Sequence, residues 1–171
     1  MAGYVIHLAV AEEYIKRHKN QIEDYNKFIE GIIYPDEVQD KSSTHYGKKS
    51  SKVILKDFLK EHRIDTCFEK GYFLHLVTDY LFYNSFLEYF SKDIYEDYDI
   101  SNKYLIEKYD VKIPNNIKSK IFYKEGNTKI FTIEAICKFI EKTSEYDLEN
   151  IREEILKSNE FWTTIIHLEH K

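Results

Sequence analysis

The segment from residue 67 to residue 90 has apolar residues nearly all the way around the helix that its spacing predicts. A helix of this kind is stable when the rest of the fold surrounds it, so we expect it to be central and mostly buried. The chain of 171 residues contains five Gly and two Pro, which disfavours a turn-rich β sandwich and favours long helices. The sequence therefore predicts an all-α fold, a single-domain helical bundle over residues 1–171 around the helix at about 67–90.

Apolar residues at helical spacing predict further elements on both sides of this helix. The stretch 32–51 is different, because it contains Pro35 and Gly47 and is rich in Ser, Asp and Lys, which together predict a long loop. The remaining expectations are helices at 4–19, at 21–30 with a stop at Gly31 and at 52–61, a polar turn and short helix in 91–111, loops around a short element in 111–129, and two or three amphipathic helices in 130–168.

Charge and hydropathy exclude several classes of partner. The formal net charge is −5 and no basic stripe occurs, which argues against binding of duplex nucleic acid. No run of about 18 apolar residues occurs, so we expect no membrane span. The N-terminal residues lack the pattern of a signal peptide, and Cys67 and Cys137 belong to no paired motif. We expect a cytoplasmic protein with two buried free thiols.

The stretch GYFLHLVTDY, inside the predicted central helix, carries His75 and Asp79 four residues apart. Positions i and i+4 lie on one face of a helix, with Cβ atoms roughly 5–6 Å apart. A buried carboxylate is very costly without a partner. Three interpretations compete at this point: a structural His–Asp hydrogen bond, an ion pair of Asp79 with a Lys or Arg elsewhere, or a metal held by both residues.

His7 presents the same anomaly, because its helical neighbours at +3, +4 and +7 are apolar or aromatic and it should point inward. Taken alone, a histidine on an apolar face is more often a core residue than a ligand. In the predicted loop, Asp36 could be a turn aspartate after Pro35, and His45 could be exposed to solvent. His167 and His170 share a helical face near the C-terminus, where a metal role is disfavoured and a charge favourable to the helix dipole is expected.

Four short motifs occur in the order VIHLA, YPDEV, STHYG and HLVTD. In this order, and over about residues 1–90, the chain resembles the zinc-dependent phospholipase C family, whose fold is shared with fungal zinc nucleases. The resemblance is to a small cytoplasmic bacterial-type member. By position it implies that the metal ligands are His7, Asp36, His45, His75 and Asp79. It also implies that Asp79 bridges two ions and that His7 belongs to the second.

The secreted members of that family bind a third zinc ion through histidines after the central helix, including a His-x3-Glu motif. This chain has no histidine between residues 76 and 166. Oxygen ligands could substitute, and the candidates are Glu96 and Asp97, together with Asp93. We expect one or two zinc ions, although other divalent metals also suit such a set of nitrogen and oxygen ligands.

The resemblance implies a metal-dependent phosphoester hydrolase in which a metal-activated water attacks a phosphodiester. Asp36 would be its catalytic base or would orient the water. The expected partner is a phosphate-containing small molecule or a phospholipid headgroup. The alternative is a non-catalytic helical protein that retains a structural metal site, which the missing downstream histidines favour. A di-iron bundle and a His-Asp phosphohydrolase are disfavoured, because neither paired Glu-x-x-His motifs nor a His-Asp dipeptide occurs.

Overall fold

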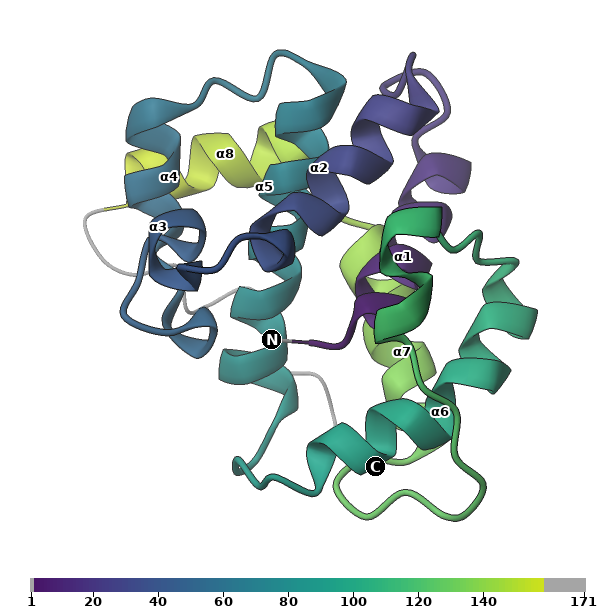
Figure 1. Ribbon diagram of the computed structural model, residues 1–171. Helices are drawn as coiled ribbons and strands as arrows, with labels where there is room; N and C mark the ends of the chain where they lie inside the picture. The colour runs from purple at the N-terminus through teal and green to yellow at the C-terminus, as the bar shows by residue number, and fades with distance from the viewer. Residues whose placement is uncertain (1, 159–171) are drawn as a thin grey trace.

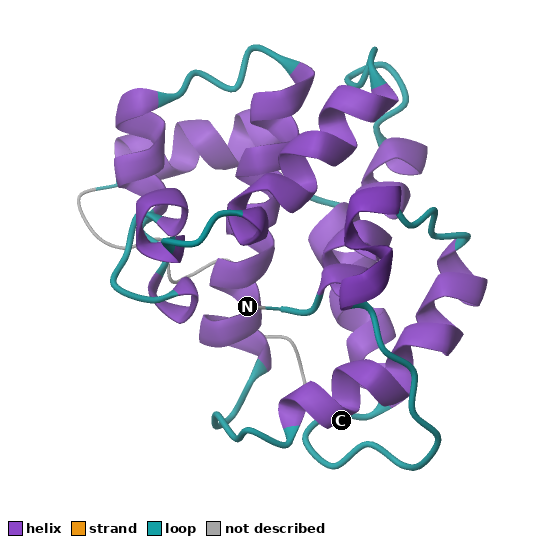
Figure 2. Cartoon of the chain, viewed as in Figure 1, coloured by secondary structure: helices purple, strands orange, loops and turns teal. Residues whose placement is uncertain are grey.

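A computed structural model of the chain describes residues 2–158, which form helices joined by loops and turns, with no strand (Figures 1 and 2). The all-α prediction is confirmed. The α-helices are α1 (Tyr4–Arg17), α2 (Tyr25–Glu37), α3 (Lys41–His45), α4 (Leu55–Glu61), α5 (Cys67–Leu81), α6 (Ile94–Tyr109), α7 (Ile133–Ser144) and α8 (Leu148–Lys157). Three short elements complete the order: η1 (Ser50–Lys52), η2 (Phe82–Phe86) and η3 (Asn115–Lys120).

Helix α5 is the central element, as its apolar pattern predicts. Every residue from Gly71 to Leu81 is buried, and the helix packs against α1, α2, α4 and α8. The side chain of Thr66 caps its first turn by accepting a hydrogen bond from the backbone N–H of Glu69. The helix is shorter than predicted, because regular α-helix ends at Leu81 and continues as the π-helical turn η2.

The predicted stop at Gly31 is wrong, because α2 runs through Gly31 to Glu37 and carries Pro35 in its last turn. Gly31 instead allows α2 and α5 to lie close together. A Cβ atom at Gly31 would lie 2.0 Å from the backbone oxygen of Phe68, and one at Gly71 would lie 2.1 Å from that of Phe28. The two glycines therefore form the crossing point of the two helices, where backbone meets backbone.

The predicted loop at 32–51 is also wrong, because this stretch contains the end of α2, then α3 and η1. The side chain of Asp40 starts α3 by accepting from the backbone N–H of Ser42. Thr44 Oγ1 donates to the backbone oxygen of Pro35 at 2.9 Å, and Tyr72 on α5 donates its hydroxyl to the backbone oxygen of Thr44 at 2.7 Å. These bonds hold the short helix against α2 and α5.

The second half of the chain is more helical than predicted, since the expected short helix is the 16-residue α6. Within 130–158, α7 and α8 account for two of the two or three expected amphipathic helices, and the rest of that range lies outside the described residues. Cys67 and Cys137 are free, as predicted; Cys137 is buried, whereas Cys67 is half-buried.

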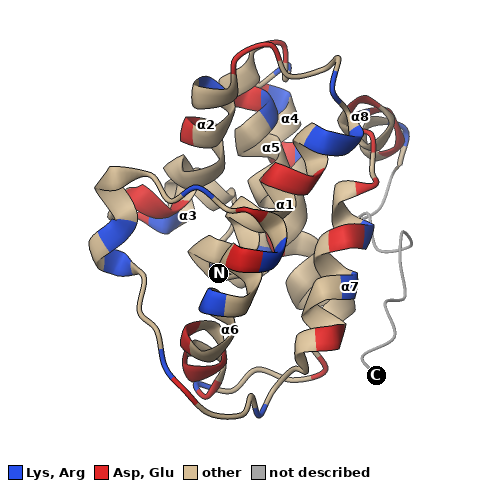
Figure 3. Ribbon diagram, turned by 90° about the vertical axis from the view of Figure 1, so that its right-hand side faces the viewer, with Lys and Arg blue, Asp and Glu red and all other residues tan. Residues whose placement is uncertain are grey.

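The charge distribution and the helix lengths describe the surface of the fold. Acidic and basic residues are interspersed over the helices in the view of Figure 3. Among the helices of residues 2–158, none combines the length and the apolar character needed to cross a bilayer.

Candidate metal centre

Four helices bring the five predicted ligands to one place in the core. His7 comes from α1, Asp36 from the last turn of α2, His45 from the end of α3, and His75 and Asp79 from α5. None of the five is more than 6% exposed. His45 is therefore a buried residue rather than the solvent-exposed histidine of the simpler interpretation.

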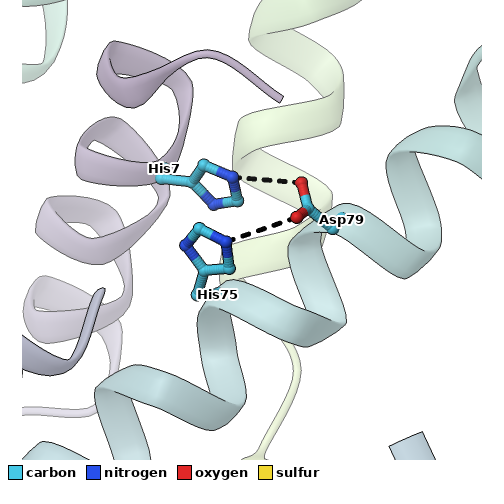
Figure 4. A group of neighbouring side chains, drawn as sticks. All are labelled: His7, His75 and Asp79. Carbon is cyan, nitrogen blue, oxygen red and sulfur yellow. Dashed lines mark hydrogen bonds and ion pairs between the residues drawn. The ribbon is translucent and has the colours of Figure 1, made fainter. Parts of the chain in front are cut away.

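The carboxylate of Asp79 lies between three imidazole rings. Its Oδ1 is 3.1 Å from His7 Nε2, and its Oδ2 is 3.3 Å from His75 Nε2, as Figure 4 shows. The same Oδ2 is 3.2 Å from His45 Nε2. Oδ1 also accepts a hydrogen bond of 2.9 Å from the backbone N–H of Ala2. The two oxygens of Asp79 thus face different histidines, which is the arrangement of a bridging carboxylate.

Asp36, on α2, lies close to two of these histidines, His45 and His75. Its Oδ1 is 3.4 Å from His45 Nε2, and its Oδ2 is 3.8 Å from His75 Nε2. The two Nε2 atoms are 3.3 Å apart. Lys41 Nζ lies 3.6 Å from Asp36 Oδ1 and is the cation nearest to the centre among the ion pairs of the described residues.

The separations around His45 are close to those around a tetrahedral ion, whereas Asp36 Oδ2 and His75 Nε2 are 3.8 Å apart. Ligand atoms around zinc, with bonds of about 2.0–2.1 Å, are separated by about 3.3–3.4 Å. The contacts of His45 Nε2 with Asp36, Asp79 and His75 are 3.2 to 3.4 Å long. Asp36, His45 and His75 thus form one group of possible ligands, and Asp79 Oδ2 lies 3.2 Å from His45 Nε2 and 3.3 Å from His75 Nε2.

The second group of possible ligands consists of His7, His75 and Asp79. An imidazole nitrogen binds one ion, so His75 Nε2 can serve one group at a time. If it serves the first, residues 2–158 would offer a second ion His7 Nε2 and Asp79 Oδ1. The geometry thus provides one nearly complete coordination set and one incomplete set joined by Asp79.

Hydrogen bonds to the far ring nitrogens orient two of the histidines. His75 Nδ1 lies 2.7 Å from the backbone oxygen of Ile32, and His45 Nδ1 lies 2.9 Å from that of Lys41. A carbonyl accepts, so each Nδ1 carries a proton and each Nε2 can point a lone pair at a metal. The rings of His7 and His75 stack at 3.7 Å with an angle of 7° between them.

Several buried polar atoms in the centre are left without a hydrogen bond. Within residues 2–158, no bond of good geometry reaches either carboxylate oxygen of Asp36, Oδ2 of Asp79 or Nδ1 of His7. Buried acceptors without well-aligned donors are costly, and three of these four atoms are carboxylate oxygens that face imidazole nitrogens. A metal ion would satisfy these oxygens, so the residues present fit a metal.

Electrostatics favour ionised carboxylates in this place. Burial opposes ionisation of Asp79, but His7 and His75 outweigh it and hold the pKa of Asp79 well below its usual value. Burial likewise opposes ionisation of Asp36, and interactions with His75 and then His45 lower the pKa of Asp36. The centre therefore offers two carboxylates ready to bind a cation.

The pKa values of His7 and His45 are shifted in opposite directions. Burial lowers the pKa of His7, and repulsion from His75 adds to this effect. Burial would also lower the pKa of His45, but its interactions with Asp36 and Asp79 raise it to about 9. In the metal-free protein at neutral pH, His45 therefore holds a proton between the two carboxylates, and a metal ion must displace that proton to bind.

Glu96 and Asp97 belong to neither group of possible ligands. Glu96 pairs with Lys124 at 2.6 Å and with Lys129 at 3.7 Å. The buried Asp97 accepts backbone hydrogen bonds of 2.7 to 3.1 Å from three consecutive residues, 129 to 131. The carboxylate of Asp97 thus fixes the segment before α7. His167 and His170 lie outside the described residues.

The contacts of two residues near the centre were not predicted from the sequence. Lys41 orients His45 through its backbone oxygen and pairs with Asp36 through its side chain. Its position four residues before His45 was a signal, because a residue at the end of a short helix can reach the carbonyl one turn back. The contact of Ala2 with Asp79 had no signal in the sequence, since it depends on how α1 packs against α5.

Comparisons of the chain with models of protein families, with curated proteins and with solved structures found no match. The likeness to the zinc-dependent phospholipases C therefore stays a prediction from the four sequence motifs. The fold and the clustering of the five residues are observations of this chain itself, and they identify a buried site that could hold a metal ion.

Proposed function

We propose that this chain is a metal-dependent phosphoester hydrolase, with zinc as its metal, that resembles the zinc-dependent phospholipases C. One observation carries the proposal: five buried His and Asp residues from four helices point their ring nitrogens and carboxylate oxygens at one another at distances that suit zinc. A lone His–Asp hydrogen bond or an ion pair would not require five such residues.

Metal ions in this centre would neutralise the charge of a phosphate and activate a water for attack on phosphorus. Asp79 would hold the centre together, because its two oxygens face different histidines. Asp36 could bind through one oxygen and leave the other to accept a hydrogen bond from the attacking water. Its lowered pKa suits a carboxylate that orients the water at neutral pH.

One observation favours the second candidate, a structural metal in a non-catalytic protein. All five residues are almost completely buried, and structural metal sites are closed whereas catalytic sites keep a position open to substrate. The second set, His7 and Asp79 Oδ1, favours catalysis instead, because residues 2–158 offer a second ion fewer ligands than a structural zinc site has.

The test combines metal analysis with turnover. Purified protein is loaded with zinc, its metal is quantified by elemental analysis, and hydrolysis is assayed with bis(p-nitrophenyl) phosphate, a dinucleotide and phosphatidylcholine vesicles. We expect at least one equivalent of zinc and hydrolysis of at least one of these phosphodiesters that chelation abolishes. His75→Ala should lose both zinc and activity. His62→Ala, which removes a half-buried histidine outside the centre, should keep both.

The two candidates give different results. Bound zinc without turnover of any of the three phosphodiesters would support the structural metal and overturn the hydrolase. A folded protein that binds no zinc or other divalent metal would overturn both.

A further inference from the structure

A pocket of about 280 Å³ opens between the start of α1, the first half of α6 and residues 120–122. α6 packs along α1 (Figure 1). Aromatic rings dominate the lining, contributed by Tyr4, Tyr95, Tyr98 and Phe122. Its volume is near the lower limit of ligand pockets, roughly 300 Å³, which is enough for one ring system.

The pocket and the metal centre are connected through the residues at the start of α1. Gly3 and Tyr4 line the pocket, and the backbone N–H of the preceding Ala2 donates to Asp79 Oδ1. The hydroxyl of Tyr4 lies 3.3 Å from the backbone oxygen of Asp36. Residues that line the pocket therefore follow Ala2, which contacts the carboxylate of Asp79, and one of them, Tyr4, contacts the backbone of Asp36.

Specific contacts hold the walls of the pocket in place. Asn102 on α6 donates its side-chain amide to the backbone oxygen of Phe122 at 2.9 Å. Tyr95 and Tyr98 meet edge to face with ring centroids 6.0 Å apart. Yet Tyr95 is 53% exposed and Phe122 is 62% exposed. The rings of Tyr95 and Phe122 are thus largely exposed, although the backbone at Phe122 is held by Asn102.

The charges in the lining balance. Asp99 contributes one carboxylate, and Lys120 contributes one ammonium group that pairs with Glu37 at 2.9 Å. The formal charges of the side chains that line the pocket therefore cancel. Aromatic walls with balanced charge suit a flat, uncharged ring, which gains from edge-to-face or offset contacts in addition to the burial of its area.

We propose that this pocket binds an uncharged aromatic group of the phosphoester whose phosphate lies at the metal centre. This inference rests on the proposed function and adds the class of substrate. Tyr95 and Phe122 would be the residues that determine specificity, because their exposed faces are available to a ring. The same pocket would give little advantage to a small alkyl ester.

The experiment measures binding by calorimetry to the zinc-loaded full chain, without turnover. The probes are phenyl phosphate, methyl phosphate and hexyl phosphate. We expect phenyl phosphate to bind at least about tenfold more tightly than methyl phosphate and more tightly than hexyl phosphate. Tyr95→Ala and Phe122→Ala should reduce this preference for the phenyl ester and leave the affinity for methyl phosphate unchanged.

The matched controls are Tyr104→Ala and Tyr123→Ala. Tyr104 lies further along α6, and Tyr123 follows Phe122 in the sequence. Both tyrosines are exposed, and neither lines the pocket. They should keep the phenyl preference. Equal affinity of the three esters, or a preference that survives both pocket variants, would overturn the aromatic pocket and leave the hydrolase standing. A stronger gain for hexyl phosphate would assign the pocket to an aliphatic chain instead. Absence of binding by all three esters would overturn both proposals.

Discussion

Asp79 is the residue on which the geometry of the centre depends. It is completely buried, its two oxygens face different histidines, and its pKa is held well below the usual value although burial opposes this. Asp97 is an equally buried carboxylate with a different task, since it accepts three backbone hydrogen bonds. Substitutions of these two aspartates can therefore be compared, because both are buried and only Asp79 is a candidate metal ligand.

Asp79→Asn should therefore abolish or strongly reduce zinc binding, because an amide is a poor bridge between two ions. Asp97→Asn should lower the free energy of unfolding by about 1–3 kcal/mol through weaker hydrogen bonds, and it should keep the zinc stoichiometry. Elemental analysis and denaturant unfolding of both variants provide the comparison. If Asp97→Asn kept its fold but lost zinc, Asp97 would be a metal ligand after all.

At the scale of elements, the crossing of α2 and α5 positions the ligands. α2 carries Asp36 and α5 carries His75 and Asp79, and the helices touch through Gly31 and Gly71. A methyl group at either glycine would collide with backbone atoms of the facing helix, and backbone cannot yield as a flexible side chain does. The distance between Asp36 and α5 is therefore coupled to two residues outside the centre.

Gly31→Ala should push α2 away from α5, lower the free energy of unfolding by about 1–3 kcal/mol or more, and weaken zinc binding. Asn26→Ala is the matched control, because Asn26 is an exposed residue on the same helix. Thermal unfolding with and without zinc measures both effects. A Gly31→Ala protein as stable as the control would show that the close approach of the helices is not needed.

At the scale of the whole molecule, the free energy of unfolding of the metal-free protein should depend on pH, because His45 titrates. Its pKa is about 9 in the folded state, against about 6.5 when unfolded. A raised folded pKa stabilises the fold fully below about pH 6.5, and this stabilisation is lost as pH rises to about 9. Zinc binding should strengthen over the same range, because zinc must displace the proton of His45.

Unfolding in the presence of a chelator tests this expectation for wild type and His45→Gln. The difference in free energy of unfolding between them should be largest near pH 6 and shrink, by on the order of 1–3 kcal/mol, towards pH 9. His62→Gln serves as a reference for the replacement of a histidine outside the centre. A difference that stays constant with pH would contradict the raised pKa of His45.

Helix content and the central helix could be predicted from the sequence because they depend on local periodicity. The scarcity of Gly and Pro and the all-round apolar pattern of α5 have the same meaning in any tertiary context. Gly31 misled the prediction because glycine is common both at helix ends and where two backbones meet. The sequence alone does not distinguish these two uses, since the second depends on a helix 40 residues away.

The inward position of His7 and the shared face of His75 and Asp79 followed from helical spacing, so the sequence by itself determined that buried polar residues needed partners. Only the tertiary structure decided that Asp36 and His45 provide them, while Glu96 and Asp97 bind lysines and backbone instead. The physical reason is that a metal centre is defined by ångström-scale distances between atoms of different helices. Those distances are set by the packing of α1, α2 and α3 against α5.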